Sequence, residues 1–152
     1  MEELNYFTRL GNVYTMKRQY VHGFTVVAGF CMFALVGPFI DLPEMTWIFG
    51  VIAILSLISI YRKKVVIDLA GGEIVAKSGL INSPVHIPLQ NFQNFQLVRT
   101  TQYLITLNTS LHIIYHQNGE EKYAIIAQGF TTGSMQKIMN EMVEILEANE
   151  SK

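Results

Sequence analysis

Two long apolar runs near the start of the chain constrain its fold more than any other feature. They cover residues 20–40 and 45–61, and only Asp-Leu-Pro-Glu lies between them. The hydrocarbon core of a bilayer is about 30 Å thick and takes about 20 helical residues, with about 17 near the lower limit. Trp47 and Tyr61 lie near the ends of the second run, where aromatic rings favour the membrane interface. The sequence therefore predicts a transmembrane helical hairpin over residues 20–61.

Two other interpretations of these runs explain the sequence less well. A signal peptide has a short basic start and a small-residue cleavage site, whereas here about twenty polar and aromatic residues come first and a second run follows. A helical pair buried in a soluble domain would need a large surrounding core, yet the chain has 152 residues. Between Gly23 and Ile60 the only charged residues are Asp41 and Glu44, so neither helix has a face suited to water.

The cations beside the two runs predict the orientation of the hairpin. Lys17 and Arg18 precede the first span, Arg62, Lys63 and Lys64 follow the second, and the connecting loop has no Lys or Arg. Cationic flanks stay on the cytoplasmic side, so we expect both termini in the cytoplasm. The five cations would also bind anionic headgroups. The same residues would also fit an ordinary charged helix end that has no role at a membrane surface.

The segment that precedes the first span, residues 1–19, has a weaker pattern. Leu4, Phe7, Leu10 and Tyr14 recur at helical spacing, although a glycine-asparagine pair interrupts them. The pattern favours a short helix that lies on the lipid headgroups on the cytoplasmic side.

The hydrophobic period changes to two at Val65, which marks the start of a second domain over residues 65–152. About six or seven short alternating segments follow, with Gly-Gly and Asn-Gly turn signals between some of them. The chain then ends in an amphipathic helix whose apolar stripe is Met135, Ile138, Met139, Met142, Ile145 and Leu146. The fold class predicted is a membrane α-helical hairpin plus an α+β domain, an antiparallel β-barrel or sheet closed by that helix.

The order of these elements resembles small bacterial membrane proteins in which a two-span hairpin precedes a pleckstrin-homology-like (PH-like) domain. The resemblance is carried by "RKKVVIDLAGGEIV", "HIPLQNF", "QNGEEKYAIIA" and the helix from Ser134 to Ala148. It implies a PH-like fold for residues 65–152 and a location in the bacterial inner membrane. It implies no particular function, because this fold hosts many.

The charge pattern argues against two classes of ligand. PH-like domains that bind phosphoinositides place several cations around the first strand turn, but here that turn is Ala-Gly-Gly-Glu, with only Lys77 beyond it. We therefore expect no specific phosphoinositide binding. The net charge is −1 and no basic face is visible, so nucleic acid is an improbable partner.

No catalytic or metal constellation is evident in the sequence. His112 and His116 lie four apart on a predicted strand, about 13 Å from each other, which is too far for one ion. The single cysteine, Cys31, lies among apolar residues that would not stabilise a thiolate. We predict a protein that is not an enzyme and that has no cofactor and no metal.

The segment "QNFQNFQ", residues 90–96, is the most unusual stretch of the predicted domain. On a regular strand Phe92 and Phe95 would face opposite sides. A bulge could turn both rings inward and leave the amides in water. Alternatively, an amide-lined edge with an aromatic anchor could accept a partner's strand. The second interpretation makes a candidate binding site of Gln90, Phe92, Asn94, Phe95 and Gln96.

Small residues suggest how the two spans pack, since helices in lipid approach most closely through small side chains. An antiparallel hairpin would place Gly29 level with Ser56 and Met32 level with Ala53, with Gly50 nearer the loop. We expect these five residues to form the helix–helix contact.

These features favour a non-enzymatic inner-membrane protein that presents a PH-like interaction module to the cytoplasm, as a subunit or accessory factor of a membrane protein complex. The expected partners are the lipid bilayer and a membrane protein. Two alternatives stay open: an immunity protein that neutralises a membrane-acting toxin, and a lipid-regulated sensor.

Overall fold

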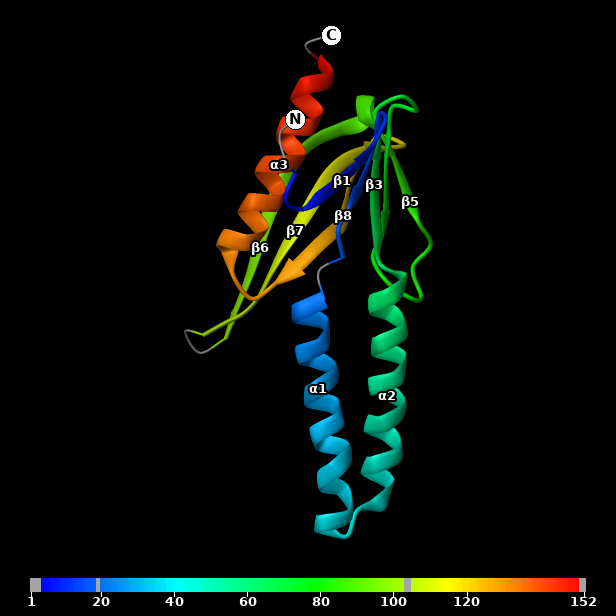
Figure 1. Ribbon diagram of the computed structural model, residues 1–152, viewed down its shortest axis with the longest axis vertical. Coiled ribbons are helices and arrows are strands. Elements are labelled where there is room, and N and C mark those ends of the chain that lie inside the picture. Colours follow the sequence, from blue (N-terminus) through cyan, green and yellow to red (C-terminus); the bar gives the residue numbers. More distant parts are fainter. Residues whose placement is uncertain (1–3, 19, 103–104, 151–152) are drawn as a thin grey trace. The chain divides into compact units, whose positions relative to one another are not determined.

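The computed structural model describes residues 4–18, 20–102 and 105–150 (Figure 1). The chain divides into two compact units. One contains the helical hairpin, residues 18–63, together with the loop residues 79–82. The other contains the residues before the hairpin and the remaining residues after it.

The helical unit consists of two apolar helices joined by a short turn. Helix α1 spans Tyr20–Val36 and continues as a 3-10 turn, η1, over Gly37–Ile40, while α2 spans Pro43–Arg62. Both are long and apolar enough to cross a membrane. Only 11% of each span is buried within the protein, whereas the core helix of a soluble domain would be mostly buried. The prediction of two apolar helices at these positions is confirmed.

Contacts between α1 and α2 are closest at two levels. Near the open end, a Cβ added to Gly23 would lie 2.6 Å from Ile60 Cδ1. At the same end the rings of Tyr20 and Tyr61 have centroids 6.1 Å apart. Near the turn, the Thr46 hydroxyl donates to a carbonyl of α1 at 2.9 Å. The two helices are therefore in contact both at the open end of the hairpin and next to its turn.

These contacts differ in part from the small-residue interface predicted from the sequence. Ala53 is buried and Ser56 half-buried, as expected for a contact position. Met32, however, is 68% exposed, and a Cβ on Gly29 or Gly50 would meet nothing within 4 Å. Phe49 of α2 instead stacks on Phe30 and Phe33 of α1, so aromatic side chains supply part of the contact between the helices.

The N-terminal segment is a β-hairpin, and the prediction of an interfacial helix there is wrong. Strand β1 spans Phe7–Leu10 and β2 spans Val13–Met16, with Gly11 at φ +63° in the turn between them. A Gly-Asn pair between apolar residues is a hairpin signal, because the tight turn needs a positive φ. Phe7 is buried, whereas Leu10 is exposed.

Two antiparallel sheets form the second unit. The five-stranded sheet has the order β1-β2-β3-β4-β5, and the three-stranded sheet has the order β6-β7-β8. The sheets do not close into a barrel, which corrects the barrel form of the prediction. The strands that follow the helices are β3 (Lys64–Asp68), β4 (Glu73–Lys77), β5 (Val85–Pro88), β6 (Phe92–Gln102), β7 (Ile105–Gln117) and β8 (Glu120–Gly129).

The hairpin between β7 and β8 follows the sequence signal closely. Asn118 and Gly119 have φ of +57° and +80°, the left-handed conformation that a two-residue hairpin turn requires. Strand β7 is one continuous element of 13 residues, whereas the sequence suggested two shorter strands there.

Helix α3, Thr132–Glu150, packs against the three-stranded sheet (Figure 1). Four residues of its predicted apolar stripe are buried in the core with the inward residues of both sheets. These are Met135, Ile138, Met142 and Ile145. The prediction of antiparallel β-structure followed by one C-terminal helix is therefore confirmed, in the form of two sheets with the helix packed on one of them.

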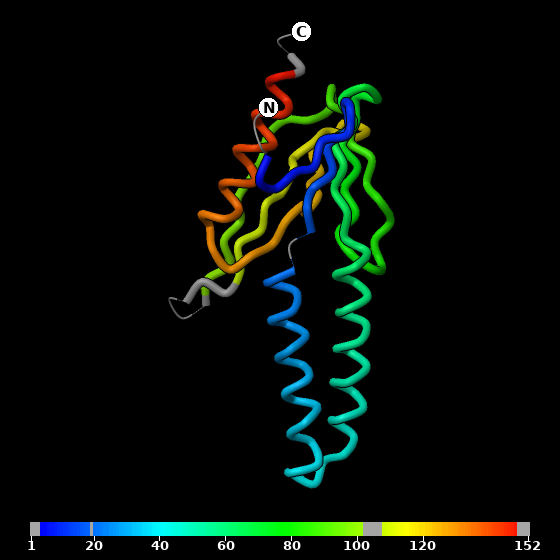
Figure 2. The backbone as a smooth tube through the Cα atoms, in the orientation of Figure 1, coloured from blue at the N-terminus to red at the C-terminus, as the bar shows by residue number. Residues whose placement is uncertain are grey.

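The helical hairpin is an insertion between two neighbouring strands of one sheet. Strand β2 pairs with β3, with Tyr14 opposite Ile67, and the whole helical hairpin connects them. Figure 2 shows the N-terminal strands running beside β3 although the helices separate them in sequence. The domain predicted as residues 65–152 thus also contains residues 4–17.

A buried carboxylate on α3 holds the start of β1. Glu141 is only 9% exposed, and its two oxygens accept the backbone N–H groups of Tyr6 and Phe7 at 3.0–3.1 Å. Nearby, the Lys17 ammonium donates to the carbonyl of Leu4 at 2.8 Å. Glu141 lies outside the predicted apolar stripe, and its burial is not visible in the sequence because a backbone partner leaves no trace in a side-chain pattern.

We predict that Glu141→Leu destabilises the β-rich unit by about 1–3 kcal/mol, because two amides lose their acceptor. Amide hydrogen exchange of the full chain in detergent should show faster exchange at Tyr6 and Phe7. The matched control Glu147→Leu changes an exposed residue of the same helix and should shift stability by about 0.5 kcal/mol or less. Unchanged protection of β1 in Glu141→Leu would contradict the assignment.

We also predict that Gly23→Leu separates the open ends of α1 and α2, at a cost of about 1–3 kcal/mol, because the added side chain meets Ile60. Cysteines at positions 20 and 61, in a Cys31→Ala background, report the separation through a short bifunctional crosslinker. Gly23→Leu should slow crosslinking, while Gly29→Leu, which has open space, should not. Equal rates in the two variants would refute the contact.

Candidate functional site

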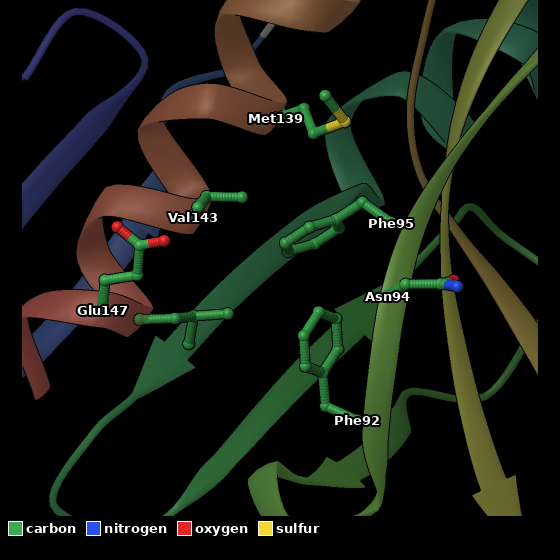
Figure 3. Close-up of a pocket in the computed structure, with 7 residues that line it drawn as sticks. Phe92, Asn94, Phe95, Met139, Val143 and Glu147 are labelled. Carbon is green, nitrogen blue, oxygen red and sulfur yellow. The ribbon is translucent and has the colours of Figure 1, made fainter. Parts of the chain in front are cut away.

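An apolar groove lies between strand β6 and helix α3. Its volume is about 360 Å³, and Figure 3 shows the side chains around it. Sheet and helix supply opposite walls. The lining residues are Phe92, Asn94 and Phe95 of β6 and Met139, Val143, Leu146 and Glu147 of α3.

A β-bulge at the start of β6 creates the aromatic wall of the groove. Phe92 pairs with Tyr115 and Asn94 with Ile114, so Gln93 is an extra residue in the ladder. The extra residue cancels the alternation of the strand, and Phe92 and Phe95 therefore lie on the same face. Their ring centroids are 4.9 Å apart, and both rings are half-buried. The bulge, one of the two interpretations of this segment, is confirmed.

The helical wall is formed by three apolar residues at helical spacing. Met139, Val143 and Leu146 follow one another at i, i+4 and i+7, which places them on one face of α3. Met139 and Leu146 belonged to the predicted stripe, and both remain only half-buried. Val143 was missed, although its spacing to Met139 was visible in the sequence. Glu147 adds a carboxylate at the exposed end of this wall.

The structure brings together three of the five residues predicted for a binding edge. Phe92, Asn94 and Phe95 line the groove, with the amide of Asn94 pointing away from the two rings (Figure 3). Gln90 lies in the short 3-10 turn η2, Leu89–Asn91, and is exposed. Gln96 is exposed farther along β6 and does not line the groove.

Strand β6 lies at one edge of its sheet. In the part of the chain that the structure describes, its ladder runs to β7 alone, over most of eleven residues. A long edge strand presents backbone donors and acceptors that another extended segment can use. The groove therefore borders an edge that is open to pairing.

The histidines on β7 take the positions expected for the outer face of a strand. Leu111, Ile113 and Tyr115 are buried, while His116 is exposed and His112 is half-buried. The His112 ring stacks on Tyr123 of β8 at 5.2 Å, and burial lowers the pKa of its imidazole. Among the described residues, no group of three or more His, Cys, Asp and Glu could hold a metal ion.

The five predicted membrane-surface cations lie at the two junctions of the hairpin. Lys17 and Arg18 fall between β2 and α1, and both are exposed. Arg62 is the last residue of α2, Lys63 is its C-cap, and Lys64 begins β3. Burial lowers the pKa of the Lys63 ammonium.

Comparison with models of protein families, with curated proteins and with solved structures found no match to this chain. The groove is therefore interpreted from its own residues.

The stacked histidine gives a pH prediction. The pKa of His112 is lower in the folded chain than in the unfolded chain, so the unfolded chain binds the proton more tightly. The contribution of His112 to the free energy of unfolding is therefore fully present only above the unfolded pKa, about 6.5. Stability should fall as the pH drops from 6.5 through the folded pKa. In His112→Gln, urea midpoints at pH 7.5 and 5.0 should differ less than in the unmodified chain. His116→Gln should leave the difference unchanged, and an equal effect of both variants would reject the assignment.

Proposed function

We propose that this protein is a membrane-anchored, non-enzymatic binding module that holds an extended segment of another membrane protein in the groove between β6 and α3. The observation that carries the proposal is the bulge, which places Phe92 and Phe95 side by side beside an open strand edge. Such an edge supplies backbone hydrogen bonds, and pockets for side chains supply selectivity.

The connectivity of the chain supports membrane anchorage with both ends on one side. Strands β2 and β3 are hydrogen-bonded neighbours, so both ends of the inserted hairpin return to the same sheet. A hairpin that crosses a bilayer twice satisfies this condition, whereas a single crossing would not. The cations at both junctions favour the cytoplasmic side of a bacterial inner membrane for this sheet.

The arrangement of the β-rich unit is consistent with a PH-like module. Two antiparallel sheets followed by one covering helix is the order that the resemblance implies. In this chain the first two strands precede the membrane hairpin, so the module is assembled from both sides of the insertion.

The lining of the groove defines the chemistry of its partner. Two half-buried aromatic rings and three aliphatic side chains suit one or two apolar side chains of an extended segment. Glu147 lines the same groove. A lysine or arginine near the apolar side chains of the partner would complement this carboxylate.

Site-specific photocrosslinking in host membranes tests this function in the full chain. Benzoylphenylalanine in place of Phe92 should give a discrete adduct with a membrane protein, and mass spectrometry should place the crosslink in an extended segment. Benzoylphenylalanine in place of Tyr123, an exposed aromatic residue on β8, is the matched control and should not give this adduct.

A second variant separates binding in the groove from chance proximity. Val143→Glu places a charge on the helical wall and should abolish the adduct at position 92 while the chain still folds. An adduct that survives Val143→Glu, or that forms equally at position 123, would refute the proposal. An adduct with lipid alone would favour a sensor, and one with a membrane-acting toxin would favour an immunity protein.

A further inference from the structure

The loop between β4 and β5 carries an apolar pair that the core does not use. Leu80 is half-buried, and Ile81 is 94% exposed, the most exposed large apolar side chain in the part of the chain that the structure describes. A single exposed isoleucine is ordinary on a protein surface. The position of this loop gives it significance.

The strand register brings this loop to the end of the sheet where the hairpin joins it. Lys64, which follows α2 almost directly, lies opposite Lys77 at the end of β4. The chain leaving β4 therefore starts beside the chain that enters β3. The turn at the other end of this strand pair, residues 69–72, is about 13 Å away along β3.

The loop itself belongs to the helical unit. Residues 79–82 cluster with α1 and α2, and a Cβ added to Gly79 would lie 2.9 Å from the Ser59 hydroxyl. Gly79 also has a φ of +149°, which side-chain-bearing residues rarely adopt. A glycine thus allows the loop to lie directly against the last turns of α2.

This contact sets the depth of the apolar pair. Ser59 precedes the cation Arg62 by three residues, about 4.5 Å along the helix axis. Ile58 and Tyr61, on the same turns of α2, are 40% and 49% exposed and face the surroundings of the helix. Leu80 and Ile81 directly follow Gly79, which lies against Ser59. At Ser59 the apolar surface of α2 meets its cationic end.

We propose that the loop over residues 79–82 is a lipid-inserted element, in which Leu80 and Ile81 enter the upper acyl region of the bilayer beside α2. The occupant of this surface is lipid, because the surface continues the apolar face of the membrane helix. The like charges of Lys64 and Lys77 repel across the ladder, and anionic headgroups at this depth would offset that repulsion. The inference rests on the membrane anchorage proposed above and gives the domain a third attachment to the bilayer.

Depth-dependent fluorescence quenching tests the proposal in the full chain reconstituted in vesicles of phosphatidylcholine and phosphatidylglycerol. Three single-cysteine chains carry the same environment-sensitive dye. One keeps the native Cys31 of α1, the second is Cys31→Ala with Ile81→Cys, and the third is Cys31→Ala with Ala70→Cys. Ala70 is exposed in the turn at the opposite end of the β3–β4 pair and is the matched control.

The expected result is a different quenching pattern at each position. Lipids with a nitroxide deep in the acyl chain should quench the dye at position 31. Lipids with a nitroxide near the headgroup should quench position 81 and shift its emission to the blue, while position 70 should respond only to aqueous iodide. If lipid quenches the dye at position 31 but iodide reaches position 81 as readily as position 70, the proposal that the loop inserts into lipid is wrong. Loss of quenching at position 31 would overturn the anchorage itself.

Discussion

The pairing of β2 with β3 is the interaction on which the rest of the structure depends. It joins Tyr14 to Ile67 across the whole helical hairpin, and closing a loop of that length normally costs entropy. The helices reduce this cost because they bring their own ends together. At the open end of the hairpin the ring centroids of Tyr20 and Tyr61 are 6.1 Å apart. The two ends of the hairpin are thus in contact with each other, and the chain that leaves them forms the neighbouring strands β2 and β3.

This dependence explains which elements could be predicted from the sequence. The apolar helices, the strands after residue 63 and the C-terminal helix each follow from a local pattern of length and periodicity. Strands β1 and β2 follow less directly, because β2 pairs with β3, which lies beyond the helical hairpin in sequence. The spacing of Leu4, Phe7 and Leu10 favours a helix, whereas the Gly-Asn turn signal that follows them favours a β-hairpin, and the pairing of β1 with β2 and of β2 with β3 agrees with the turn signal.

The candidate site shows the same division between local and non-local signals. The unusual composition of residues 90–96 singles out a segment of which three residues line the groove, and the bulge is one of its two predicted forms. The helical wall of the groove could not be assigned, since the sequence does not say which strand meets Met139 or Val143. Glu141 is the clearest case, because it accepts the backbone N–H groups of Tyr6, just before β1, and of Phe7, and almost any sequence there would offer the same donors.

Under the proposed function, attachment and recognition involve different sheets. The hairpin joins the five-stranded sheet at β2 and β3, whereas the groove lies on the three-stranded sheet, at β6, and on α3. A segment that adds to β6 therefore leaves the β2–β3 ladder intact. For a partner in the same membrane, the proposed anchorage would raise the effective concentration of the groove, so modest contacts would be enough for occupancy.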